Sequence, residues 1–176
     1  MKKVTCVHKS NVMRITDGLF VKACTEVSKD YPDITFEQMY VDACAMNLIR
    51  QPEQFDVIVT TNLFGDILSD ESSQVVGGLG MAPAANLGDD FALFEPVHGA
   101  AFDIAGQNIA NPSSFLLSIK MMLEWLGTKH NDPKCFEVAV KLESTIFDLV
   151  KSGIKTKDIG GDSTTSEFTK KITDNL

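Results

Sequence analysis

The sequence predicts an α/β fold, and three features of the 176-residue chain support this class. Strand-like and helix-like segments alternate in the first half, as they do in layered α/β domains. The second half is mostly helical in pattern and begins with a long region of small residues. Hydrophobic residues make up 44% of the chain, which is enough to bury a core in one domain or in two small lobes.

The first half alternates between strands and helices. Strands are expected at three segments: 2–8, 34–41 and 56–60. The last of these is an apolar run between polar residues, which predicts a buried strand. Helices are expected at three segments: 13–29, 42–50 and 64–76. The first helix carries one apolar stripe, formed by Ile15, Leu19, Phe20, Ala23 and Val27.

The second half begins with a long region that has little regular pattern. Residues 81–111 are rich in Gly, Ala, Pro and Asn, and one short strand is expected at 91–94. Irregular regions this long inside compact domains tend to be functional. Three helices follow: one at 111–126, one at 133–151 after an Asp132-Pro133 cap, and a last one after a capping box at 164–167.

The composition disfavours several classes of partner. The basic side chains number 16 and the acidic ones 24, and the resulting net charge of −8 argues against nucleic acid and anionic membranes. We find no apolar run near the roughly 20 residues of a membrane span and no apolar signal segment. The four cysteines lack Cys-x-x-Cys spacing, so we expect reduced thiols in a cytoplasmic protein. Only Arg14 and Arg50 are arginines, so residues suited to gripping a multiply charged anion are scarce.

Two aspartates mark a candidate metal site in the helix expected at 64–76. Asp66 and Asp70 are four positions apart and share one helix face, where two carboxylates can hold Mg²⁺ or Mn²⁺. They follow a strand that feeds a helix, which is where α/β folds bind ligands. The competing interpretation is that both acids only stabilise the helix N-terminus through its dipole.

Lys9 and Asp42 also have two interpretations each. Asp42 starts a helix just after a strand, where an N-cap is the simplest role. Lys9 lies in a loop after a strand, where a lysine is usually a solvated charge. Buried beside aspartates, Lys9 would instead be suited to proton transfer.

The loop at 96–106 carries one histidine and one aspartate among small residues. Its backbone can approach a nucleotide closely, and Asp103 beside a ribose would bind the 2′-hydroxyl and repel a 2′-phosphate. His98 has a simpler alternative as a structural loop residue. The sequence contains no Gly-x-Gly-x-x-Gly, so a standard Rossmann site is not supported.

Four motifs in this order resemble the isocitrate/isopropylmalate dehydrogenase family of β-decarboxylating dehydrogenases. They are His-Lys-Ser-Asn-Val-Met at 8–13, Tyr-Val-Asp-Ala at 40–43, Asn-Leu-Phe-Gly-Asp-Ile-Leu-Ser-Asp at 62–70, and Glu-Pro-Val-His-Gly at 95–99 continuing to Asn111-Pro112. The resemblance runs along nearly the whole chain but covers only the C-terminal portion of such enzymes. It implies the C-terminal portion of the two-lobed isopropylmalate dehydrogenase-like fold, which is not a Rossmann fold. A dimer-forming lobe would span about 1–76 and a cofactor-loop lobe about 77–176.

The resemblance also implies roles for individual residues. Asp66 and Asp70 would bind Mg²⁺ or Mn²⁺ together with Asp42 of a neighbouring subunit. Lys9 and Asp42 would relay the proton of the substrate hydroxyl, and Lys9 and Asn11 would contact the substrate. NAD would be held by the following residues: His98, Gly99, Ala100, Ala101, Phe102, Asp103, Ile104 and Asn111. Asp103 would select NAD over NADP, and Phe102 stands where proline is common.

The activity implied by the resemblance is NAD-dependent, metal-assisted oxidative decarboxylation of a 2-hydroxy acid by a homodimer with a shared active site. Segments 77–83 and 86–89, with the loop at 8–13, favour isocitrate or homoisocitrate over 3-isopropylmalate. The substrate-gripping arginines belong to the portion of the family that this chain does not match. We therefore expect the chain to need a separate N-terminal half for turnover. The alternative is a non-catalytic fragment or dimerisation module derived from such an enzyme.

Overall fold

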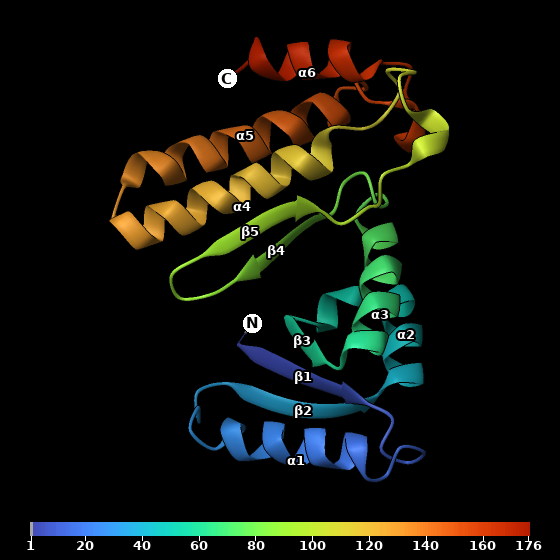
Figure 1. Ribbon diagram of the computed structural model, residues 1–176, viewed down its shortest axis with the longest axis vertical. Coiled ribbons are helices and arrows are strands. Elements are labelled where there is room, and N and C mark those ends of the chain that lie inside the picture. Colours follow the sequence, from blue (N-terminus) through green and yellow to red (C-terminus); the bar gives the residue numbers. More distant parts are fainter. Residues whose placement is uncertain (1) are drawn as a thin grey trace. The chain divides into compact units, whose positions relative to one another are not determined.

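The computed structural model describes residues 2–176, and the chain divides into two compact units. The first unit ends at Val75 and the second runs from Val76 to Leu176. Each unit has its own hydrophobic core. The two are described separately below, with the element labels of Figure 1.

The first unit is built on a parallel sheet. Its elements in chain order are β1 (Lys3–His8), α1 (Thr16–Ser28), β2 (Thr35–Tyr40), α2 (Val41–Arg50), the short 3₁₀ turn η1 (Pro52–Gln54), β3 (Val57–Thr60) and α3 (Asn62–Val75). The strand order β2-β1-β3 puts β1 in the middle (Figure 1). Both of its neighbours run parallel to β1, so the carboxyl ends of all three strands meet at one edge.

Alternation along β1 divides the sheet into two faces. On one face Val7 packs with Cys44 and Leu48 of α2, and this cluster forms the core of the unit. On the other face Val4 lies opposite Phe20 of α1, and both residues line an apolar groove of about 440 Å³. The sheet is therefore covered by α2 on one face and by α1 on the other.

Two sequence predictions about this unit were wrong. The strand expected to be buried is β3, an edge strand in which Val57 is 54% exposed, while β1 occupies the centre. The predicted stripe of α1 is not buried within the chain, since Ile15, Leu19 and Val27 are exposed and Asp17 is the residue that α1 buries. Both errors arise because burial depends on which elements lie alongside a segment, which local pattern does not reveal.

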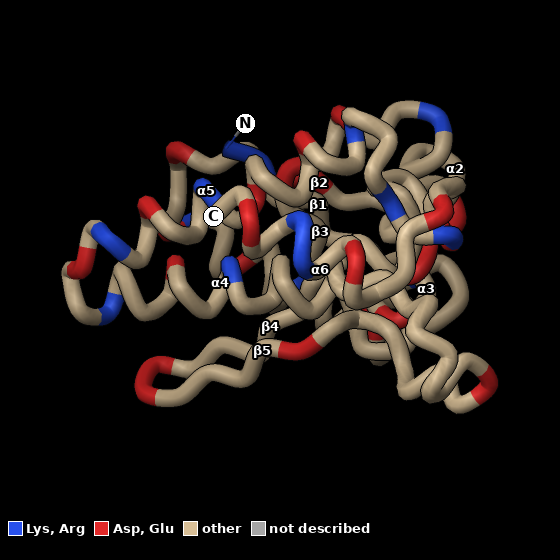
Figure 2. The backbone as a smooth tube through the Cα atoms, turned by 90° about the horizontal axis from the view of Figure 1, so that it is seen from above, with Lys and Arg blue, Asp and Glu red and all other residues tan. Residues whose placement is uncertain are grey.

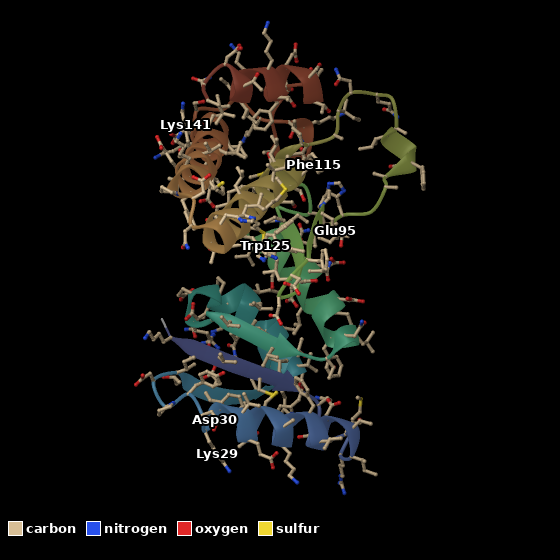
Figure 3. The ribbon with its side chains drawn as sticks, turned by 60° about the vertical axis from the view of Figure 1, so that its left-hand side comes forward. Lys29, Asp30, Glu95, Phe115, Trp125 and Lys141 are labelled. Atoms are coloured by element: carbon tan, nitrogen blue, oxygen red, sulfur yellow. The ribbon has the colours of Figure 1, made fainter. Side chains whose placement is uncertain are left out.

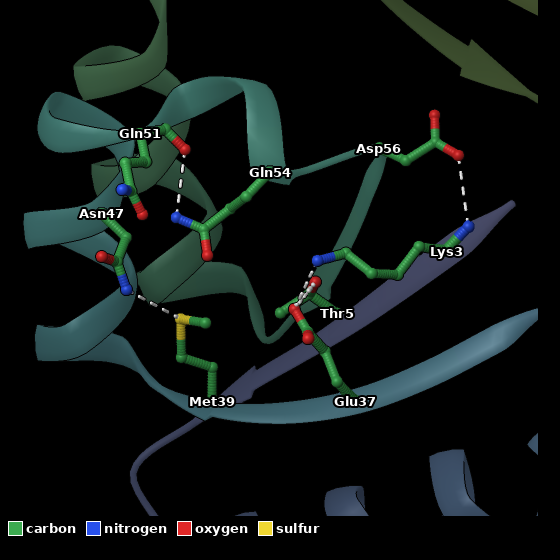
Figure 4. A network of polar contacts seen from close by, with 8 residues as sticks. All are labelled: Lys3, Thr5, Glu37, Met39, Asn47, Gln51, Gln54 and Asp56. Carbon is green, nitrogen blue, oxygen red and sulfur yellow. Dashed lines mark hydrogen bonds and ion pairs between the residues drawn. The ribbon is translucent and has the colours of Figure 1, made fainter. Parts of the chain in front are cut away.

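A polar network fixes the register of β1 against its neighbours (Figure 4). The hydroxyl of Thr5, which is fully buried, donates to Glu37 Oε1 at 2.6 Å, and Lys3 Nζ lies 3.0 Å from the same carboxylate. The backbone N–H of Lys3 donates to Asp56 Oδ2 at 3.2 Å. The hydroxyl of Thr5 and the ion pair together hold the pKa of Glu37 below its usual value, although burial opposes them.

The second unit combines a hairpin with three helices. Its elements are β4 (Pro83–Leu87), β5 (Ala92–Pro96), the 3₁₀ turn η2 (Phe102–Ile104), α4 (Ser113–His130), α5 (Pro133–Lys151), the 3₁₀ turn η3 (Lys157–Ile159) and α6 (Thr165–Thr173). The helix α4 packs on the hairpin and on α5, and α6 packs on α5 (Figure 1). Figure 3 places Trp125 of α4 at the hairpin, where its ring meets Phe94 edge-on at 6.3 Å. The core is formed by Met81, Leu117, Leu142, Ile146, Phe168 and Ile172.

The capping signals of the second unit are confirmed, whereas its hairpin was missed. Asp132 caps α5 through the N–H of Lys134, and Thr164 with Glu167 forms the predicted capping box of α6. β4 and β5 pair in antiparallel fashion, so the region expected to hold one short strand holds two. The turn between them carries Asp89 and Asp90 and stands out as an acidic tip in Figure 2. Within residues 2–176, no helix is long and apolar enough to cross a membrane.

Candidate functional site

Lys9 and Asp42 meet at the carboxyl edge of the parallel sheet. Lys9 directly follows β1, and Asp42 is in the first turn of α2, which begins where β2 ends. Because β1 and β2 are parallel neighbours, their ends bring the two side chains together, with Lys9 Nζ 2.8 Å from Asp42 Oδ1. The hydrogen bond from Lys9 is the largest cause that lowers the pKa of Asp42. Asp42 is not the N-cap, because Tyr40 occupies that position.

Two aromatic rings flank the lysine. His8 is buried, and its Nδ1 accepts a hydrogen bond from the Ser10 N–H at 3.2 Å, so its imidazole is neutral in this arrangement. Burial lowers the pKa of His8, while the nearby Asp17 carboxylate acts in the opposite direction. The ring of Tyr40 lies edge-on to His8 at 5.2 Å and 5.8 Å from Lys9 Nζ. Asn11 is exposed in the same loop.

The aspartates Asp66 and Asp70 lie on α3, which follows β3. The helix begins at Asn62, before the predicted start at 64, so neither aspartate is in its first turn. The helix dipole weakens beyond the first turn, so it does not account for these acids. Both are exposed, and no ion pair or side-chain hydrogen bond engages either carboxylate within the described part of the chain. Two hard oxygen donors on one helix face are thus free to bind a cation.

A single chain does not assemble the full set of acids predicted for the metal. Among the residues that the structure describes, no group of three His, Cys, Asp or Glu side chains is placed to hold an ion. Asp42 is instead paired with Lys9 of its own chain. Asp66 and Asp70 therefore offer two ligands, and further ligands would have to come from outside the chain.

The loop after β5 is open to solvent. Ala100 to Asp103 are exposed, and Phe102 is 88% exposed in the short turn η2. Ala101 has a left-handed backbone with φ of 44°, which is uncommon for a residue with a side chain. His98 Nδ1 lies 3.0 Å from the Gly99 carbonyl oxygen. A Cβ added at Gly99 would meet nothing within 4 Å, so the chain's own packing does not demand glycine there.

Asn111 lies at the end of this loop and is held within the chain. It is 8% exposed, its Oδ1 accepts from the Ser113 N–H at 2.9 Å, and its Nδ2 donates to Asp158 Oδ2 at 3.0 Å. A Cβ at Gly80 would lie 2.7 Å from the same Asp158 oxygen, so any larger residue there would have to displace the side chain that Asn111 binds. The side chain of Asn111 thus ties the loop to α4 and to η3.

Two residues of these sites were not found from the sequence. Asp158 anchors Asn111 from a position far along the chain, and no local pattern marks it. Asp17 is 1% exposed and accepts a hydrogen bond from the Lys9 N–H at 2.6 Å. An aspartate at the start of a helix is common, so the sequence gives no sign of this contact.

Comparison with known proteins gives one consistent result. A family model described as isocitrate/isopropylmalate dehydrogenase matches residues 1–173. The chain is 55% identical over 176 residues to the 3-isopropylmalate dehydrogenase of Sulfurisphaera tokodaii, covering 99% of this chain and 52% of the relative. It is 54% identical over 162 residues to the homoisocitrate dehydrogenase of Methanocaldococcus jannaschii, covering 90% of this chain and 46% of the relative.

A solved structure agrees with these matches. The isocitrate dehydrogenase of Methylococcus capsulatus superposes with a TM-score of 0.91 at 45% identity, over 99% of this chain and 50% of that one. The chain thus spans about half the length of the relatives that it matches.

Proposed function

Because the chain belongs to the isocitrate/isopropylmalate dehydrogenase family, we propose that it supplies the metal-binding, proton-transfer and cofactor-loop half of an NAD-dependent decarboxylating dehydrogenase. The observation that carries this proposal is the Lys9–Asp42 ion pair at the carboxyl edge of the sheet. Ligands of α/β proteins bind at this edge. The relatives are named as dehydrogenases of 3-isopropylmalate, homoisocitrate and isocitrate, and this chain covers about half of each.

The acids of the first unit suit Mg²⁺ or Mn²⁺. Asp66 and Asp70 are exposed carboxylates one helical turn apart, and Asp42 of a second copy would be the third ligand. Such a metal, when bound, would polarise the hydroxyl oxygen of the substrate and stabilise negative charge on it after CO₂ is lost. Holding the cation is thus the role of α3, and its free carboxylates support that role.

Lys9 and Asp42 would move the proton of the substrate hydroxyl. A 2-hydroxy acid must lose this proton as its hydride passes to NAD. Lys9 Nζ donates a hydrogen bond to the Asp42 carboxylate, so a proton that Lys9 passes to Asp42 leaves a neutral amine able to take the hydroxyl proton. Asp42 is exposed enough to exchange that proton with solvent. The exposed Asn11, two residues along the same loop, would contact the substrate beside Lys9.

The open loop of the second unit would hold the adenosine half of NAD. The residues from Gly99 to Asp103 are exposed, His98 and Ile104 are half-buried, and the empty space at Gly99 leaves room for a ligand to approach the backbone. The carboxylate of Asp103 would accept hydrogen bonds from a ribose and repel a 2′-phosphate, which favours NAD over NADP. Asn111 would hold the end of the loop, since its amide is already bonded within the chain.

The substrate is a 2-hydroxy acid with a second carboxylate that is lost as CO₂. The segments at 77–83 and 86–89 favour isocitrate or homoisocitrate. Relatives named for 3-isopropylmalate and for homoisocitrate match at 55% and 54% identity, so the names do not rank these substrates. All three acids therefore belong in the test.

The active form would be a homodimer that also contains the half of the enzyme not covered by this chain. Exposed apolar side chains follow the outer faces of α2 and α3, with Met46 65%, Ile49 76%, Leu63 66% and Ile67 56% exposed. A second copy packed on these helices would cover them and bring its Asp42 toward Asp66 and Asp70. The substrate-gripping arginines would come from the uncovered half.

The test is a complementation assay. The chain is co-expressed with the N-terminal half of the Sulfurisphaera tokodaii relative, and NADH formation is followed with Mn²⁺ and each of the three acids. We expect turnover with at least one acid from the pair and none from the chain alone. A Lys9→Met variant should form the same complex without turnover. A stable complex that fails with all three acids would contradict the proposed activity and favour a non-catalytic module.

A further inference from the structure

A buried carboxylate accepts a hydrogen bond from the backbone of the lysine of the proposed site. Asp17, in the first turn of α1, is 1% exposed, and its Oδ2 accepts the backbone N–H of Lys9 at 2.6 Å. We propose that Asp17 is a positioning residue that fixes the backbone of Lys9 and thereby aims its ammonium at Asp42. The importance of Asp17 for catalysis rests on the proposed function. Its effect on the position of Lys9 can be tested without any activity assay.

The Asp17 carboxylate differs from a surface carboxylate because it is buried. Taking an ionised group out of water is costly unless hydrogen bonds replace the lost hydration. Within the described chain, no lysine or arginine forms an ion pair with Asp17, and its hydrogen bond comes from the Lys9 backbone. The N-terminus of α1 adds a favourable dipole. The buried carboxylate is therefore hydrogen-bonded to the backbone of the residue that carries the ammonium.

The backbone of Lys9 is held on both sides. Asp17 takes its N–H, and its carbonyl oxygen accepts the N–H groups of Val12 at 2.9 Å and Met13 at 2.8 Å. The Asp17 N–H in turn donates to the Met13 carbonyl oxygen at 3.1 Å, which closes the loop onto the helix. The loop therefore cannot shift along α1 without breaking the Asp17–Lys9 contact.

A fixed backbone determines where the lysine side chain can reach. From this anchor Lys9 Nζ arrives 2.8 Å from Asp42 Oδ1, with its side chain 24% exposed. The flexible four-carbon side chain of Lys9 loses conformational freedom when its ammonium is held at Asp42. Fixing the backbone of Lys9 reduces the number of other positions that the ammonium can occupy. Removing the anchor should leave Lys9 present and charged but less often at Asp42.

The test measures the acetylation rate of individual lysines by acetic anhydride, read by peptide mass spectrometry on the full chain. An Asp17→Ala variant removes the acceptor of the Lys9 N–H, whereas asparagine would keep an acceptor oxygen at that position. Lys3 is the matched internal control in the same unit, since its side chain is 17% exposed and pairs with Glu37 at 3.0 Å. A Thr5→Val variant removes a buried hydrogen bond of the same unit without touching the Lys9 loop.

We expect the Asp17→Ala variant to raise the Lys9 rate at least about fivefold and to leave the Lys3 rate unchanged. The Thr5→Val variant should leave Lys9 protected. In an Asp42→Asn background, where Lys9 has already lost its partner, the Asp17 substitution should add little. An unchanged Lys9 rate in folded Asp17→Ala protein, or a common rise of Lys3 and Lys9, would overturn the proposal.

A second measurement covers the case in which the variant does not fold. In the unaltered chain, the Lys9 amide should exchange with deuterium at least about tenfold more slowly than the exposed amide of Asn11. Rapid exchange at Lys9 would overturn the proposal without any substitution. Neither measurement uses substrate, so a failed activity assay would refute the proposed function and leave these results standing.

Discussion

Asn111 holds the end of the loop after β5 through two side-chain hydrogen bonds. An Asn111→Ala substitution removes the acceptor of the Ser113 N–H at the start of α4 and the donor to Asp158. Losing a polar group that satisfies the start of a helix costs about 1 kcal/mol. Losing the second, partly buried hydrogen bond adds about 1 kcal/mol. We therefore expect a loss of about 2 kcal/mol, which for a unit of this size lowers the melting temperature by about 10 °C.

The assay is thermal unfolding followed by circular dichroism, together with urea unfolding at 25 °C. Asn175→Ala is the matched control, because Asn175 is exposed and its amide donates only to the Lys171 carbonyl in the last turn. That control should change stability by less than about 0.5 kcal/mol. An Asn111→Ala protein as stable as the control would refute the internal network and would return Asn111 to a role in direct ligand contact.

Three further predictions address other parts of the molecule. Gly80→Ala should destabilise the second unit in thermal unfolding, because the added Cβ would lie 2.7 Å from Asp158 Oδ2, and an unchanged melting temperature would contradict this packing. Asp66→Asn should weaken Mn²⁺ binding in calorimetry without loss of stability, since its carboxylate is free, and equal affinity would count against the metal assignment. Burial lowers the pKa of His8 below its usual 6.5, so the unfolded chain binds a proton at His8 at a higher pH than the folded chain does. Urea unfolding should therefore report falling stability as the pH drops through 6.5. A His8→Asn variant should flatten that slope, and an unaltered slope would assign it to other groups.

Local signals in the sequence were sufficient for the helix ends. The Asp132-Pro133 pair and the Thr164–Glu167 box act through neighbouring residues, and the predicted helix at 133–151 agrees with the observed α5. Such caps depend on side chains that reach backbone groups only two or three positions away. Pattern alone was therefore enough to locate them.

Features that depend on distant partners could not be predicted in the same way. The central strand is β1 rather than the more apolar β3, because strand order is set by the crossovers between elements. β4 was missed because Pro83, Ala84 and Asn86 are poor strand formers, and pairing with β5 supplies the stability that their propensities lack.

In the candidate site, too, some residues could be predicted from sequence motifs and others only from the folded structure. Family motifs located Lys9 and Asp42, and the structure adds their 2.8 Å contact. The anchors Asp17 and Asp158 come from tertiary structure, because each acts on a residue brought near by folding rather than by motif. The pairing of Asp42 with Asp66 and Asp70 stays a prediction that needs a second copy of the chain.

We propose that two copies share each active site, with Lys9 and Asp42 from one and Asp66 and Asp70 from the other. The most direct measurement mixes two inactive complemented enzymes, one carrying Lys9→Met and the other Asp66→Asn, after exchange of subunits. In a shared site, each mixed dimer contains one site with both lesions and one site with neither. Random exchange should then restore about one quarter of the unaltered activity. A mixture that forms mixed dimers by mass spectrometry yet stays as inactive as either variant would contradict the claim.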